Sequence, residues 1–112
     1  MEISHHQIMP ETAVITVAGR VMLGPESEQI TTLVSNLLGE GTHAIIFNIA
    51  GVTAIDSTGI GRFIASYNKI AAAGGEMRIT GATGYLFQAF HVCRLDTVFR
   101  FYPSLDEACK SL

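Results

Sequence analysis

The chain has 112 residues, of which 48% are hydrophobic, and it carries a formal net charge of −3 with a pI of about 5.7. This length fits one domain over residues 1–112, and so large an apolar fraction can fill a core without disulfides or metal ions. The seven basic residues are scattered, which argues against nucleic-acid binding, and no apolar run approaches the roughly 18 residues of a membrane span.

The N-terminal segment predicts an antiparallel hairpin. Residues 2–9 alternate loosely between apolar and polar and are typical of an edge strand, with a turn at Pro10. Residues 13–18 are a strong β run, which Gly19 closes.

A helix is predicted to begin at Gly24-Pro25-Glu26, because proline is favoured in the first turn and acidic residues suit the helix dipole there. Apolar residues then recur at spacings of three and four between positions 30 and 38, and Gly39 and Gly41 end the helix. Residues 43–49 form a continuous apolar run, as expected for a buried parallel strand.

The second half continues the alternation of helices and strands. The expected elements are a helix over 57–73, a strand over 77–80, a short helix over 83–91, a strand over 98–101 and a last helix over 104–112. This order predicts a single α/β domain with about four helices and a mixed, mostly parallel sheet that begins with the antiparallel hairpin.

Cellular location is indicated by the cysteines and by the N-terminus. Cys93 and Cys109 lie in segments that look helical and half apolar, and we expect two core thiols in a reducing compartment. The first residues lack the basic and apolar regions of a signal peptide, so the sequence predicts a cytoplasmic protein.

The segment that begins at Asp56 is the strongest candidate for a functional site. Asp56 is the only formally charged residue between Glu40 and Arg62, and it stands where a strand gives way to a helix. It suits a plain helix N-cap, and it equally suits a contact site, because functional groups gather at this edge of α/β sheets. Ser57 and Thr58 follow with two hydroxyls.

Gly59 and Gly61 favour the contact site. Each costs the helix about 1 kcal/mol relative to alanine, and no packing reason for either is visible in the sequence. Without Cβ atoms, the helix start lets another backbone or a phosphate approach closely.

Catalysis, cofactor binding and metal binding are not indicated. Position 64 is Ile64, so the glycine-rich nucleotide signature fails, and Ile55 replaces the first glycine of a nucleophile elbow around Ser57. His5 and His6 would point to opposite faces of a strand, and His91 and Cys93 do not share a helix face. The sequence therefore predicts no enzyme, no cofactor and no metal site.

The run Ile55-Asp56-Ser57-Thr58-Gly59-Ile60-Gly61 resembles the phosphorylation-site motif of the STAS-domain anti-sigma factor antagonists. The resemblance extends over nearly the whole chain, through Gly19, residues 48–52, residues 74–77 and residues 95–99. The order of these motifs is more specific than any one of them.

The resemblance implies a binding protein controlled by phosphorylation. Members bind an anti-sigma factor, often a serine kinase, and so release a sigma factor; the kinase phosphorylates the serine after the aspartate, here Ser57, and a serine phosphatase reverses the step. The partner surface expected here comprises Asp56, Ser57, Thr58, Gly59, Gly61, Arg62, Met22 and Leu23. Whether the chain forms a homodimer is left open.

One loop departs from the better-known members. They commonly carry an acidic residue after the glycine that follows the second strand, whereas this chain has Arg20 after Gly19 and no acid before Glu26. Met22 and Leu23 in that loop are either an apolar partner patch or an entry to the core. An alternative reading is a STAS module without a switch, which serves a transport ATPase or a signalling assembly.

Overall fold

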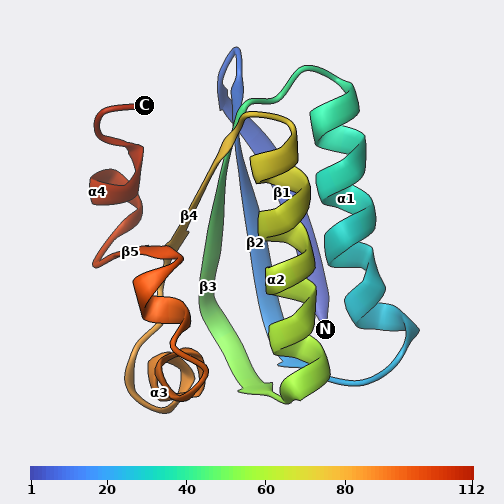
Figure 1. The fold of residues 1–112 in the computed structure, drawn as a ribbon, viewed down its shortest axis with the longest axis vertical. Coiled ribbons are helices and arrows are strands. Elements are labelled where there is room, and N and C mark those ends of the chain that lie inside the picture. The colour runs from blue at the N-terminus through green and yellow to red at the C-terminus, as the bar shows by residue number, and fades with distance from the viewer.

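A five-stranded mixed sheet forms the centre of the molecule, in the order β1-β2-β3-β4-β5 (Figure 1). The computed structural model describes residues 1–112. β1 pairs antiparallel with β2, and the other neighbours are parallel, so the predicted α/β class and N-terminal hairpin are confirmed. None of the helices combines the length and the hydrophobicity that a membrane span requires.

The elements follow one another as strand–helix units. Their bounds are β1 Glu2–Met9, β2 Thr12–Val21, the 3-10 turn η1 Pro25–Ser27, α1 Glu28–Gly39, β3 Ala44–Ile55, α2 Ser57–Ala72, β4 Glu76–Thr80, α3 Gly84–Val92, the 3-10 turn η2 Leu95–Thr97, β5 Arg100–Tyr102 and α4 Leu105–Cys109.

Alternation along the strands divides the core between the two faces of the sheet. On β3, Phe47 belongs to the main core that α1, α2 and α3 cover, whereas Ile46 points to the opposite face. There Ile46 packs with Val14 and with Ala108 of α4. The sheet is therefore covered on both faces, but unequally.

Two central strands are longer than the sequence predicts. β2 does not close at Gly19, where φ is +84°, but continues to Val21, and β3 runs on to Ile55. Val21 and Ile55 are partners in the parallel register. Pairing between the two strands supports residues 50–55, whose glycine and mixed burial give little strand signal alone. Both strands thereby end beside the start of α2.

The C-terminal elements also differ from expectation. The N–H of Phe99 bonds to the carbonyl of Leu95 at 2.7 Å, so residues before Arg100 turn in η2 instead of pairing, and β5 is shorter and later than predicted. α4 ends at Cys109 and not at position 112, because Lys110 adopts an extended conformation.

The prediction of two core thiols is wrong for Cys93. Cys93 follows the last turn of α3 and is exposed, while Cys109 is half-buried against the smaller core. Val92, next to Cys93, is exposed and lines the same surface groove as Cys93, whereas Phe90 is buried in the main core.

Candidate functional site

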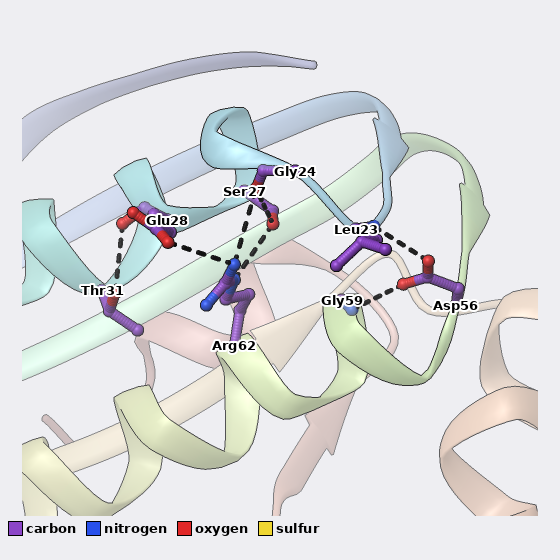
Figure 2. Close-up of polar contacts among 8 residues, drawn as sticks. All are labelled: Leu23, Gly24, Ser27, Glu28, Thr31, Asp56, Gly59 and Arg62. Atoms are coloured by element: carbon purple, nitrogen blue, oxygen red, sulfur yellow. Dashed lines mark hydrogen bonds and ion pairs between the residues drawn. The ribbon is translucent and has the colours of Figure 1, made fainter.

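The candidate site lies at the end of the sheet where β2 and β3 finish and α2 begins. Asp56 is the N-cap of α2, and its Oδ1 accepts a hydrogen bond from the N–H of Gly59 at 2.8 Å. Its Oδ2 accepts a second one from the N–H of Leu23 at 2.9 Å (Figure 2). The capping role expected for Asp56 is confirmed, and the same carboxylate also holds the loop after β2.

These hydrogen bonds keep Asp56 ionised. The N–H of Gly59 contributes most to holding its pKa below the ordinary 3.8, the N–H of Leu23 contributes next, and desolvation opposes both. Hydrogen bonds to the charged form lower a carboxyl pKa because they stabilise the anion. A fixed negative charge therefore stands beside Ser57 at neutral pH.

Ser57 is the first residue of α2 and is exposed, whereas the neighbouring Thr58 is half-buried. The Ser57 hydroxyl is thus open to a second molecule at a helix N-terminus. No basic group is provided for it. His91 of α3 does not line the groove that contains Ser57 and is paired with Asp96 at 2.8 Å. No three His, Cys, Asp or Glu side chains gather in a way that could hold a metal ion.

The two glycines of the motif serve different purposes. A Cβ on Gly59 would lie 2.1 Å from the carbonyl oxygen of Val21, so the helix can approach β2 only without a side chain there. Gly59, which is also buried, therefore has a packing reason that is not visible in the sequence. A Cβ on Gly61 would meet nothing within 4 Å. Only Gly61 leaves open space on the helix surface.

Arg62 holds α2 to the turn before α1. Its Nε donates to the Oγ of Ser27 at 3.0 Å, and its Nη2 lies 3.5 Å from the carbonyl oxygen of Gly24 and 3.7 Å from Glu28 (Figure 2). Ser27 is buried and in turn donates to Gly24. The guanidinium is therefore directed toward η1 and α1, and its contacts there give it a structural role.

Large apolar side chains are exposed on two elements that adjoin the start of α2. Leu23 is 78% exposed on the side of the β2–α1 loop, and Tyr85 and Val92 are 70% and 78% exposed on α3. Met22, beside Leu23, is half-buried, and both line a hollow of about 350 Å³ near the N-terminus. Exposed apolar groups of this size around one polar residue are typical of a protein-binding surface.

A groove of about 310 Å³ separates the start of α2 from α3. Its lining consists of Ile55, Asp56, Ser57, Ile60, Tyr85, Gln88, Ala89, Val92 and Cys93. The sequence reasoning missed the α3 side of this groove. The sequence did contain a sign of it. The short helix Gly84–Val92 is apolar on nearly every face, so it has more apolar residues than a helix that buries only one face requires.

Sequence comparison with protein families gives a match to the STAS domain over residues 6–108. The chain belongs to this family, and the match runs from the second half of β1 through all later strands and nearly all of α4.

Solved structures of similar fold include two kinds of protein. A putative anti-sigma factor antagonist from Thermotoga maritima superposes with a TM-score of 0.84 at 17% identity, covering 95% of this chain and 90% of that one. The phosphorylated form of the Bacillus cell-fate determinant SpoIIAA gives 0.75 at 21% identity, with 96% of each chain covered. A sulfate transporter family protein from Wolinella succinogenes gives 0.80 at 15% identity, covering 92% and 85%. Identities this low show the shared fold alone.

Proposed function

We propose that this chain is an anti-sigma factor antagonist, which binds an anti-sigma factor of the serine kinase type and is released when Ser57 is phosphorylated. A serine phosphatase would restore binding, and the exchange would take place in the cytoplasm. The observation that carries the proposal is an exposed serine at a helix start, which shares a groove with the exposed Tyr85 and Val92 and follows Asp56, the residue that holds the loop of the exposed Leu23.

The apolar side chains supply the affinity in this proposal. Fully burying a large apolar side chain contributes about 1.5–3 kcal/mol. Leu23, Tyr85 and Val92 together form the apolar part of the docking surface; Tyr85 and Val92 line one groove with Ser57, and Leu23 is bonded through its N–H to the neighbouring Asp56. Any group added to Ser57 must then enter the interface.

Electrostatics supply the switch. A phosphate adds about −1.5 to −2 charges, and the α2 dipole tolerates it at this end of the helix. Ser57 follows Asp56, which is held ionised, while Arg62 is engaged with Ser27 and Gly24. The added charge thus meets a neighbouring anion without a free cation of the same helix turn to neutralise it. Phosphorylation would therefore prevent docking while leaving the domain folded.

The first test is phosphate transfer. The chain is incubated with ATP and a candidate anti-sigma factor kinase from the same genome, and its intact mass is measured. One phosphate is expected on the wild type and on Thr58→Ala, and none on Ser57→Ala. Transfer that persists in Ser57→Ala would overturn the assignment of the switch to Ser57.

The second test is binding to the same kinase. Ser57→Asp should weaken binding at least about tenfold. Tyr85→Ser and Val92→Ser should also weaken binding, but the kinase should still phosphorylate Ser57 when these variants are presented to it unfolded or as a peptide. Ser35→Asp, an equal charge on the exposed face of α1, is the matched control and should bind as the wild type does. Undiminished binding of Ser57→Asp would contradict the switch.

A second candidate is a STAS module without a switch. It is favoured by the fold shared with the Wolinella sulfate transporter family protein and by the capping role of Asp56, which needs no phosphorylation to explain it. In that case Leu23, Tyr85 and Val92 would still bind a partner. Binding would survive Ser57→Asp and fail with Tyr85→Ser.

A further inference from the structure

The outer edge of β1 is open over most of its length. β1 has eight residues, Glu2–Met9, and pairs only with β2. In an antiparallel pair, alternate residues direct their N–H and C=O groups away from the partner, so half of the backbone groups of β1 face outward.

This edge lacks the usual protection against strand addition. Proteins block exposed edges with lysine, proline, short strands or bulges. Between Ile3 and Gln7, β1 contains no charged residue and no proline, and its only irregularity lies between Gln7 and Met9. The opposite edge differs, because β5 has three residues, carries Arg100 and is followed by Pro103. Only one edge of the sheet is left available.

A groove runs between this edge and α1. Figure 1 shows α1 along the outer side of β1, and a hollow of about 400 Å³ lies between them. It is lined by Ile3, Ser4, His5, Pro25, Glu28, Gln29, Thr32, Leu33 and Asn36. The helix residues recur every three or four positions, so they form one stripe that faces β1.

The groove has the chemistry of a peptide site. Ile3 and Leu33 are half-buried against the main core and give it an apolar floor. Gln29, Thr32 and Asn36 are exposed and offer hydrogen-bonding groups. From Glu28 to Asn36 the helix rises about 12 Å, which is the length of roughly four extended residues.

We propose that the groove between β1 and α1 binds an extended peptide segment of a partner protein, which adds to β1 as a sixth strand. Backbone hydrogen bonds to β1 would supply affinity, and the α1 stripe would read alternate side chains. An apolar side chain fits over Ile3 and Leu33. A basic residue suits the end at Glu28, because this carboxylate is 65% exposed and the groove lining contains no lysine or arginine. Its one cationic neighbour, Arg62 at 3.7 Å, is already engaged with Ser27 and Gly24.

A second copy of the chain fits this edge less well than a peptide. Pairing through its own β1 would bring a second α1 to the same side of the sheet, where the first α1 already lies along the edge. A flexible segment carries no such helix with it.

Selection from a random octapeptide library, displayed on phage and panned against the full chain, tests the proposal. Enriched peptides should alternate apolar and other residues and carry a lysine or arginine. In complex with the best peptide, amide hydrogen exchange should slow within residues 2–7. Thr32→Arg fills the groove and should weaken binding at least about tenfold. Ser35→Arg puts the same charge at an exposed position of α1 that does not line the groove, and it should leave binding unchanged.

Several results would overturn this proposal. One is a library that yields no peptide. Another is a selected peptide that binds Thr32→Arg as tightly as it binds the wild type. A third is slower amide hydrogen exchange in residues 84–93 instead of in β1. A concentration-dependent dimer that Thr32→Arg dissociates would show that a second copy occupies the edge. Ser57→Asp should leave peptide binding unchanged, so failure here is distinguishable from failure of the Ser57 switch.

Discussion

The carboxylate of Asp56 accepts a hydrogen bond of 2.9 Å from the backbone N–H of Leu23, 33 positions earlier in the chain. Because the other carboxylate oxygen caps α2, one side chain fixes the helix that carries Ser57 and the loop that carries an exposed apolar side chain. The two parts of the proposed partner surface are thereby held in one arrangement before any partner binds.

Replacing Asp56 should loosen both parts at once. Asp56→Ala removes the acceptor for Gly59 and for Leu23, and loss of an N-cap alone is a recognised cause of destabilisation. We expect a melting temperature several degrees below that of the wild type, and faster amide exchange at Leu23. Asp56→Asn keeps one accepting oxygen and should fall between the two proteins. Unchanged exchange at Leu23 in Asp56→Ala would contradict the link.

The same residue should give a defined dependence of stability on pH. Since the pKa of Asp56 is lowered from 3.8 in the folded chain, its contribution is complete above the unfolded value and is lost as the pH falls through the folded value. The difference in melting temperature between wild type and Asp56→Asn should therefore have its largest value at about pH 6 and should shrink below about pH 4. A difference that stays constant over this range would show that ionisation of Asp56 is not responsible.

Gly59 and Gly61 should respond in opposite ways to alanine. Gly59→Ala forces a Cβ against the carbonyl oxygen of Val21 and should destabilise the chain by about 1–3 kcal/mol. Gly61→Ala meets nothing within 4 Å and should stabilise α2 by up to about 1 kcal/mol. Urea unfolding measures both.

Partner binding is a second property in which Gly61 can be tested. If Gly61 contacts the partner, Gly61→Ala should bind more weakly although the protein is more stable. Equal binding would remove Gly61 from the proposed surface and leave its conformational cost without an explanation.

Arg62 and Ser27 should behave as one structural unit. Arg62→Ala and Ser27→Ala each remove the 3.0 Å hydrogen bond that joins α2 to η1, and each should cost about 1 kcal/mol. The double variant should cost less than the sum of the two, since the shared bond can be lost only once. Free energies of unfolding from denaturant titrations test this, and simple additivity would show that the contact contributes nothing.

The order of helices and strands could be predicted because each repeats apolar residues with its own period. The ends of β2 and β3 could not, because Val21 and Ile55 extend their strands only by pairing with each other. The need for glycine at position 59 could not be predicted either, because the carbonyl oxygen that a side chain there would strike belongs to Val21, 38 positions away.

The candidate site was predictable where it is local and not where it is assembled. Asp56 and Ser57 stand together in the sequence, so capping and exposure follow from position. Tyr85 and Val92 come to the same surface only through the course of β4 and α3. Likewise, spacing alone puts Arg62 about one turn from Ser57, whereas the tertiary fold directs its guanidinium to Ser27 and Gly24.

Arg78 should decide whether α4 stays on the sheet. This buried side chain pairs with Glu76, and its Nη1 donates to the carbonyl oxygen of Ala108 at 2.9 Å and to that of Lys110. α4 has five residues, too few for a stable helix by itself, so it depends on these contacts and on the small core beneath it.

Arg78→Met should therefore release α4 and cost about 2–3 kcal/mol, because it leaves the two carbonyl oxygens and Glu76 without their buried donor. Amide exchange over residues 105–110 should rise sharply, while that of α2 changes only as much as global stability requires. Arg100→Met is the matched control: Arg100 also pairs with Glu76, at 3.4 Å, but is exposed, and its loss should cost no more than about 0.5 kcal/mol. Equal effects of the two substitutions would mean that the ion pair with Glu76, and not the hold on α4, accounts for the contribution of Arg78.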